Sequence, residues 1–346
     1  MRLVFVTQRV NPDDPVLGAT VAKLRALAAR VDEVVVLADA AVPDALPANC
    51  RVRLFRSRTK AGRGARFELA LARELSPRPA AVVAHMCPIY AVLAAPLARP
   101  LGVPVLLWYA HWNATPTLRL AGRLSSRLVS VDRRSVPLDS RKVVGIGHGI
   151  DMTEFSCGDG RSDSTLEAVA LGRYSAAKGL DVVVRAVGLA VERGIDVRLR
   201  LHGVASTPAE EADRDALARL VAELGIEQRV LVGGPVPRHE VPALLHDADV
   251  LVNNMRAGAP DKVVYEACAS CVPVIVSNPV FDELLDDLEP RLRFARELPD
   301  ELADRLAAFA ALGADQRRAL GRTLRERVVA AHSVETWADR ILELVQ

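Results

Sequence analysis

Cysteine and aromatic residues are scarce in this sequence, and uncharged runs are short. The 346 residues include five cysteines, and the aromatic fraction is 4%. An odd number of scattered cysteines favours reduced thiols over a disulfide framework, so we expect a cytoplasmic protein. Only residues 80–98 approach the length of a membrane span, and because His85, Pro88 and Pro96 interrupt them, we expect a strand followed by a helix. The opening stretch MRLVFVTQRV is too short for a targeting segment.

Patterns that bind metals are also missing. Cys268 and Cys271 form an isolated Cys-x-x-Cys without a second pair or a neighbouring His pair, and a helix end rich in small residues explains them more simply. The Asp-x-Asp spacing at Asp247 and Asp249 comes before a strand, whereas the metal motif follows one. We therefore expect no essential metal.

Charge is divided unequally along the chain. Residues 1–155 hold 22 Lys/Arg and 12 Asp/Glu, and the remainder holds 23 and 31. The segment from Arg51 to Arg66 alone carries seven basic residues and no acidic one. Such asymmetry predicts an anionic partner for the first half, with a solvated basic loop as the alternative. The length exceeds that of one hydrophobic core, and the composition is typical of globular α/β proteins, which predicts two domains.

Short β-branched runs alternate with helical stretches in both halves. This alternation predicts parallel sheets covered on both faces, in two doubly wound domains that face each other across a cleft. We place the first domain at 1–155 and the second at 156–331, with a polar linker at 158–164 and a terminal helix at 332–346. The expected strands are residues 3–6, 33–37, 52–55, 81–84, 105–108, 128–131, 143–146, 168–171, 197–201, 229–232, 250–252 and 272–276. The expected helices are residues 19–30, 67–75, 177–192, 209–224, 238–246, 262–270, 299–312, 315–331 and 334–345.

Two stretches of the second half could bind a phosphorylated ligand. In LGRYSAAKG, a strand leads through Gly172, Arg173 and Lys178 into a helix. Glycine lets a backbone approach a ligand, and cations with helix N–H groups favour an anion, so this junction predicts a diphosphate site or, alternatively, a solvated turn. His202 and Gly203 end the next strand, where a ligand would lie.

Glu266 opens a small-residue turn in DKVVYEACASCVPVI. A carboxylate there can accept two hydroxyls, which is what a ribose diol offers. An exposed helix glutamate is the alternative interpretation of this residue in isolation.

Together these motifs resemble the donor domain of retaining glycosyltransferases of family 4, the "group 1" class with the GT-B fold. The resemblance runs through LGRYSAAKG, LHG, VGGPV, LLHDADVLVNN and DKVVYEACASCVPVI, and reaches upstream to KVVGIGHGIDMTEF. It implies that Arg173 and Lys178 bind the donor diphosphate and that Glu266, the second glutamate of a Glu-x7-Glu motif, binds ribose. It also implies that the last helix crosses back to the first domain.

The sequence departs from the family pattern near the donor sugar. Gly258 occupies the place of the first glutamate, Asp261 and Lys262 replace a Gly-Phe-Gly stretch, and Cys271 stands where a glycine is common. Because cleavage of a glycosyl diphosphate chiefly requires neutralising the leaving group, these departures affect the donor's identity before they affect the reaction. We interpret Asp261 as a contact to a sugar hydroxyl in place of the missing acid.

In the first half the resemblance singles out His111, which follows LLWYA and matches a histidine near the donor sugar. Gly18 matches the glycine of the first strand-to-helix loop. His85 and His148 are further candidates, and each histidine could instead be a core residue. The spacing of GIGHGID, with no helix after it, excludes the dehydrogenase fingerprint.

The sequence therefore predicts a metal-independent retaining glycosyltransferase without a cofactor. It would move a hexose or N-acetylhexosamine from a UDP- or GDP-linked donor to an anionic or lipid-linked acceptor. It would be cytoplasmic, with the segment from Arg51 to Arg66 as a candidate contact to the inner membrane surface and no nucleic-acid partner. The alternatives are a small soluble natural-product acceptor, a non-catalytic sugar-nucleotide-binding protein, and an epimerase of the same fold.

Overall fold

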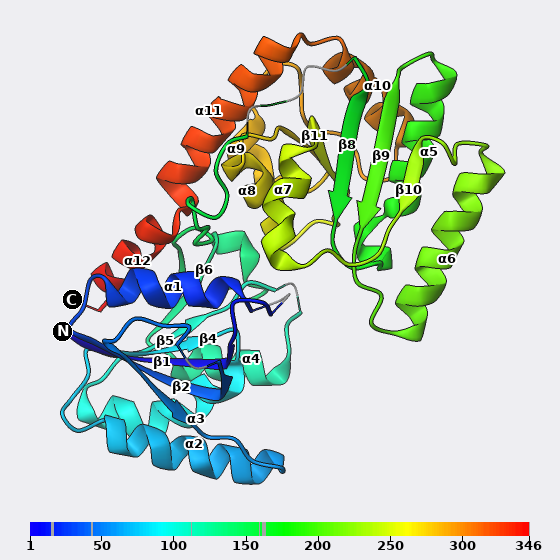
Figure 1. Ribbon diagram of the computed structural model, residues 1–346. Coiled ribbons are helices and arrows are strands. Elements are labelled where there is room, and N and C mark those ends of the chain that lie inside the picture. The colour runs from blue at the N-terminus through cyan, green and yellow to red at the C-terminus, as the bar shows by residue number, and fades with distance from the viewer. Residues whose placement is uncertain (15–16, 43, 112, 159, 161–163, 346) are drawn as a thin grey trace. The chain divides into compact units, whose positions relative to one another are not determined.

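The computed structural model describes residues 1–14, 17–42, 44–111, 113–158, 160 and 164–345. The chain divides into two compact units, the first comprising residues 1–151 with 331–346 and the second residues 152–330 (Figure 1). The sequence predicts these divisions at 155 and 331. The linker that it predicts at 158–164 lies largely outside the described residues. Within those residues, no helix combines the length and the apolar character that a membrane crossing requires.

In the first unit, the described strands form a seven-stranded parallel sheet with the order β3-β2-β1-β4-β5-β6-β7. The strands are β1 (Arg2–Val10), β2 (Glu33–Ala41), β3 (Cys50–Leu54), β4 (Ala81–His85), β5 (Val105–Trp108), β6 (Arg127–Ser130) and β7 (Val143–Gly145). The central strands are buried on both faces, which explains why they read as continuous apolar runs in the sequence. All seven expected strands of this half are confirmed.

Helices cover both faces of this sheet. They are α1 (Ala19–Ala28), α2 (Lys60–Glu74), α3 (Pro88–Ala98), α4 (Pro116–Leu124) and α12 (Val334–Glu343), with short 3-10 turns η1 (Arg99–Leu101) and η2 (Arg133–Ser135). Because side chains alternate along a strand, Val4 and Val6 pack with Phe67 of α2 in one core. On the other face Trp108 contacts Trp337 of α12, with ring centroids 5.8 Å apart.

The C-terminal residues are part of the first unit. Ile150 pairs with Ser333 in a parallel bridge, and the amides of Gly149 and Ile150 donate to the carbonyl of His332 at 3.0 and 2.8 Å. The helix α12 then lies beside α1 (Figure 1), where Arg30 pairs with Asp339. The chain thus returns to the first unit next to the point where it left it.

In the second unit, the described strands form a five-stranded parallel sheet with the order β10-β9-β8-β11-β12. The strands are β8 (Leu166–Leu171), β9 (Val197–His202), β10 (Val230–Val232), β11 (Val250–Asn253) and β12 (Val274–Val276). The helices are α5 (Leu180–Glu192), α6 (Pro208–Glu223), α7 (Val241–His246), α8 (Lys262–Ala269), α9 (Asp282–Leu285), α10 (Pro299–Ala310) and α11 (Ala314–His332). The 3-10 turns are η3 (Ala176–Lys178), η4 (Arg238–Glu240) and η5 (Pro279–Phe281). The five strands expected in this half are likewise confirmed.

Helix α2 begins earlier than expected. Thr59 caps it, since its hydroxyl accepts the amide hydrogen of Gly62 at 3.1 Å, and the helix therefore takes in the second half of the basic segment. Apolar periodicity starts only at Phe67, which is why the sequence predicted the later start. The basic segment is an edge strand, a loop and the first turns of a helix.

Candidate active site

The second unit has a topological switch point between β8 and β11. These two strands are neighbours, while β9 lies on the other side of β8 and β12 on the other side of β11. In open parallel sheets, ligands bind beyond the carboxyl ends of the strands at such a point. The loops that follow β8 and β11 therefore form the candidate site.

Lys178 and Asp261 meet at this point, one from each loop. The Lys178 ammonium donates to the carbonyl of Leu171 at 3.2 Å and pairs with the Asp261 carboxylate. Asn253, the last residue of β11, donates its side-chain amide to Asp261 Oδ2 at 2.7 Å. The lysine side chain is only 12% exposed, so a cation is held at the end of β8 beside an anionic partner from the loop after β11.

Two glycines make this arrangement sterically feasible. Gly172 has a φ of 137°, and a Cβ there would overlap the Lys178 side chain. A Cβ at Gly203, which follows β9, would overlap the carbonyl oxygen of Gly172. Gly172 therefore leaves room for the Lys178 side chain, and Gly203 lets the ends of β8 and β9 approach each other.

Arg173 and His202 lie at the rim of the same edge. The Arg173 side chain is 67% exposed and reaches within 3.6 Å of Glu210. The His202 imidazole lies 3.3 Å from the carbonyl of Gly234. Of the two predicted diphosphate cations, Lys178 is therefore held in place and Arg173 is exposed to solvent.

Glu266 lies on α8 and is buried, with a side chain that is 6% exposed. Lys262 Nζ lies 2.9 Å and Arg238 Nη1 3.1 Å from the same oxygen, Glu266 Oε1. Burial favours the neutral acid, but Lys262 and Arg238 outweigh it and hold the pKa of Glu266 below its ordinary value. The carboxylate is therefore ionised at neutral pH.

The loop after β11 carries the remaining residues predicted near the donor sugar. Gly258 has a φ of 128°, a conformation that favours glycine, and the Asn278 amide lies 3.5 Å from its carbonyl. Asp261 directs its carboxylate to Lys178 and Asn253. Its predicted contact to a sugar hydroxyl stays a prediction, and its pairing with Lys178 was not foreseen.

The predicted residues of the first unit lie at the ends of its strands. Gly18 is buried at the start of α1. His111 follows β5, and its Nδ1 accepts the amide hydrogen of Asn113 at 3.1 Å. His85, 4% exposed, packs between Phe5 and Trp108, and burial lowers its pKa well below the usual value. His85 is therefore neutral and buried.

Sequence reasoning missed a buried lysine in this unit. Lys23 of α1 is 3% exposed, and its ammonium lies 4.7 Å from the ring of Trp108 and 5.4 Å from that of Trp337. Cation–π contacts of this kind stabilise a charge that burial would otherwise penalise. Since α1, β5 and α12 are distant in sequence, no local pattern indicates the cluster.

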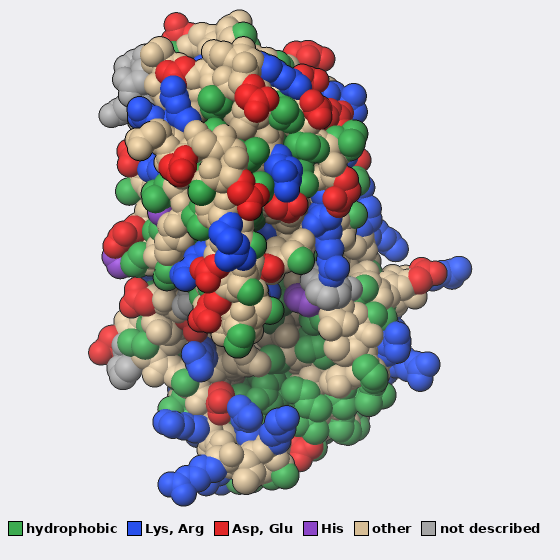
Figure 2. Space-filling model, turned by 90° about the vertical axis from the view of Figure 1, so that its right-hand side faces the viewer, with side chains coloured by type: hydrophobic (Ala, Val, Ile, Leu, Met, Phe, Trp, Pro, Cys, Tyr) green, Lys and Arg blue, Asp and Glu red, His purple; other side chains and the backbone are tan. Residues whose placement is uncertain are grey.

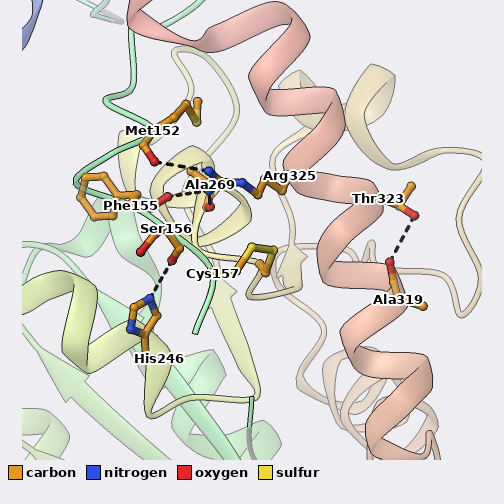
Figure 3. Close-up of a disulfide and its surroundings, with 10 residues drawn as sticks. Met152, Phe155, Ser156, Cys157, His246, Ala269, Ala319, Thr323 and Arg325 are labelled. Atoms are coloured by element: carbon orange, nitrogen blue, oxygen red, sulfur yellow. Dashed lines mark hydrogen bonds between the residues drawn. A yellow bond between two sulfur atoms is a disulfide. The ribbon is translucent and has the colours of Figure 1, made fainter. Parts of the chain in front are cut away.

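The cysteines correct one sequence prediction. Cys157 and Cys271 form a disulfide, with Cα atoms 5.0 Å apart, so the expectation of reduced thiols is wrong for these two cysteines (Figure 3). A separation of 114 residues hides this pairing from any reading of local spacing. Cys271 also has a φ of 60°, which agrees with its place at a position where the family commonly has glycine.

Comparison with solved structures identifies the class of fold. Sucrose-phosphate synthase from Thermosynechococcus elongatus superimposes with a TM-score of 0.78 at 17% identity, covering 99% of this chain and 98% of that one. Anabaena HepE in complex with UDP-glucose superimposes with a TM-score of 0.74 at 16% identity, covering 100% and 99%. The chain has the GT-B fold of glycosyltransferases.

Comparison of sequences finds similarity to one family in the second unit. Residues 159–327 match the model of the family "Glycosyl transferases group 1". WcaL of Escherichia coli K12, named as a colanic acid biosynthesis glycosyltransferase, is 31% identical over 188 residues, which are 52% of this chain and 45% of WcaL. A D-inositol 3-phosphate glycosyltransferase of Corynebacterium aurimucosum is 32% identical over 107 residues, which are 31% and 25% of the two chains. The chain thus spans less than half the length of these relatives in the matched regions.

Proposed function

We propose that the protein is a retaining glycosyltransferase that takes a nucleoside-diphosphate sugar at the carboxyl ends of β8 and β11. One observation carries this proposal. Two consecutive residues, Asp261 and Lys262, pair with the side chains that would bind the diphosphate and the ribose of a nucleotide. Asp261 holds the Lys178 ammonium, and Lys262 holds the Glu266 carboxylate. A site for diphosphate and a site for a ribose diol are thereby joined at one edge of the sheet.

In this function the C1–O bond to the diphosphate breaks as the acceptor hydroxyl oxygen bonds to C1, and the hydroxyl proton passes to an oxygen of the departing diphosphate. Lys178 and Arg173 neutralise the charge that develops on the leaving diphosphate, which is the main electrostatic requirement of the reaction. Glu266 accepts the ribose hydroxyls and fixes the nucleotide. The matched relatives are named glycosyltransferases, and HepE is described with UDP and with UDP-glucose, which supports a nucleotide-sugar donor. Retention of configuration is implied by the family resemblance.

The acceptor is proposed to be anionic or lipid-linked, and the surface of the first unit supports this. Figure 2 shows Lys and Arg side chains gathered at the lower end of the molecule, at the height of α2 in Figure 1. Arg51 and Arg53 pair with Glu74, and Arg63 pairs with Asp39, so these three serve the fold. The remaining basic residues of the segment are exposed and pair with no carboxylate of the described residues: Arg56, Arg58, Lys60 and Arg66.

The donor proposal is tested by titration calorimetry with UDP-glucose, UDP-N-acetylglucosamine and GDP-mannose. We expect one donor to bind the unaltered chain and Lys178→Ala to lose about 2 kcal/mol or more of binding free energy, because a charged hydrogen-bonding partner of the diphosphate is gone. Lys60→Ala, which removes a lysine of the first unit, is the control and should bind normally. Equal binding by Lys178→Ala would refute the assignment.

The acceptor proposal is tested with vesicles that contain anionic phospholipid. Binding should weaken as salt rises and in Lys60→Ala, while Lys178→Ala should bind as the unaltered chain does. If the protein binds no vesicles at low salt, a small soluble acceptor is the better explanation. Donor binding without any nucleotide release would instead favour the non-catalytic binding protein.

A further inference from the structure

Arg238 joins two carboxylates of the second unit. It opens the turn η4, and its side chain is 11% exposed. Nη1 donates to Glu266 Oε1 at 3.1 Å, and Nη2 donates to Glu154 Oε2 at 2.7 Å. The guanidinium carbon also lies 5.5 Å from the ring centroid of Phe155. Because the planar guanidinium is held from two sides and against a ring, its position is fixed.

The cations around Glu266 leave one of its oxygens for a ligand. Lys262 and Arg238 both contact Oε1, and among the described residues no hydrogen bond is donated to Oε2. Two cations on one oxygen fix the rotation of the carboxylate about its last bond. Oε2 is then in a defined position to accept hydroxyl hydrogens.

Glu154 belongs to the segment 152–157, with which the second unit begins. This segment is fastened to α8 at further points (Figure 3). Arg325 donates to the carbonyls of Met152 and Phe155 and also to the carbonyl of Ala269, the last residue of α8. The disulfide joins Cys157 to Cys271 just beyond that helix. Contacts near both ends of the segment 152–157 therefore link it to α8, the helix that carries Glu266.

We propose that Arg238 is a positioning residue that orients Glu266 for ribose and transmits nucleotide binding to the segment 152–157. This inference rests on the proposed function. A nucleotide that engages Oε2 adds one more contact to the carboxylate, and this contact strengthens the chain of ion pairs from Glu266 through Arg238 to Glu154. The segment 152–157 follows the first of the two points where the chain passes between the units, so donor binding acts on this connection.

The test uses the full chain and titrates UDP and GDP, taking the tighter nucleotide further. We expect Arg238→Gln to bind about tenfold more weakly than the unaltered chain, as for a lost charged hydrogen bond. Arg305→Gln is the matched control, because Arg305 bonds Glu301 and the carbonyl of Arg293 on another face and should not affect binding. Glu154→Gln keeps the pair of Arg238 with Glu266 and serves if Arg238→Gln fails to fold.

Hydrogen exchange separates transmission from a merely structural role. In the unaltered chain and in Arg305→Gln, nucleotide should slow amide exchange across residues 152–157. In Glu154→Gln, nucleotide should still bind but should no longer slow exchange there. The pH profile of nucleotide affinity is a second readout. Lys262 and Arg238 face Glu266, and Glu154 faces Arg238, so losing the Arg238 charge should raise the pKa of Glu266. Arg238→Gln should therefore move the acid limb of nucleotide affinity to higher pH, and Arg238→Lys should restore it.

The outcomes distinguish the two levels of the proposal. If the unaltered chain binds neither UDP nor GDP, the proposed function fails and the inference fails with it. If the unaltered chain binds nucleotide and Arg238→Gln binds it with the same affinity and the same pH dependence, the inference alone is overturned. Slowed exchange at 152–157 in Glu154→Gln would also overturn it.

Discussion

Asp261 offers the sharpest test of the proposed donor site, because it replaces part of the Gly-Phe-Gly stretch of the family pattern and pairs with the cation that the proposed reaction needs. The perturbation is Asp261→Asn, which keeps the shape and the hydrogen bond from Asn253 but removes the charge that holds Lys178. A diphosphate that binds the unaltered chain must compete with this carboxylate for the ammonium. In the variant that competition is absent.

The expected change in binding free energy follows from the exposure of the ion pair between Lys178 and Asp261. The side chains of Lys178 and Asp261 are 12% and 20% exposed, so the interaction is stronger than a surface ion pair, and we take it as about 1.5 kcal/mol. Removing it should tighten the binding of UDP, which has no sugar, about tenfold. Affinity for UDP-sugars should gain less if Asp261 also contacts a sugar hydroxyl.

The assay is calorimetric titration of UDP and of the preferred UDP-sugar into both proteins. The control is Asp304→Asn, which removes a carboxylate on α10 that pairs with Arg193. It should not change either affinity. Weaker or unchanged UDP binding in Asp261→Asn would refute the view that the carboxylate opposes the diphosphate. Unchanged donor preference and turnover would separately refute the contact to the sugar.

Two further predictions concern stability. The imidazole of His332, whose Nδ1 accepts the amide hydrogen of His148 at 3.2 Å, has a pKa lowered by burial to about 4. Since the unfolded value is higher, His332 stabilises the fold above about pH 6.5 and this contribution is lost as pH falls towards 4, by up to roughly 3 kcal/mol. Urea denaturation at pH 7 and pH 4.5 should show a smaller acid loss in His332→Asn, and an equal loss would contradict the assignment. Reducing the bond between Cys157 and Cys271, or Cys157→Ser, should lower the free energy of unfolding by about 5 kcal/mol by the loop-entropy model. An unfolding midpoint that is insensitive to reductant would show that the bond contributes nothing.

The central strands could be predicted from the sequence because they are buried on both faces. Runs such as residues 34–38 and 81–84 are apolar without interruption, which is the pattern of central strands in parallel sheets. Helix α4 was missed although Thr115 and Pro116 carry the signature of a helix start, the Thr115 hydroxyl accepting the amide hydrogen of Leu118. Short amphipathic helices without a long apolar face give little periodic signal.

The site was predicted only in part. Local sequence indicates which residues follow a strand, but it does not indicate which distant residues pair with them. Lys178 and Glu266 could be placed at strand ends from local sequence. Their partners could not, since Arg238 lies 28 residues from Glu266 and 84 from Glu154, and Asp261 lies 83 from Lys178. Pairings at such separations arise from the sheet order, which local composition does not specify.

The central claim is that this chain binds a sugar nucleotide at the ends of β8 and β11 and releases its nucleotide. We would measure this by saturation-transfer NMR with UDP-glucose, UDP-N-acetylglucosamine and GDP-mannose, following free nucleotide in the same tubes over time. Saturation transfer to one donor with slow nucleotide release, both lost in Lys178→Ala, is the result that we predict. Absence of transfer to every donor, or release that is unchanged in Lys178→Ala, would contradict the claim.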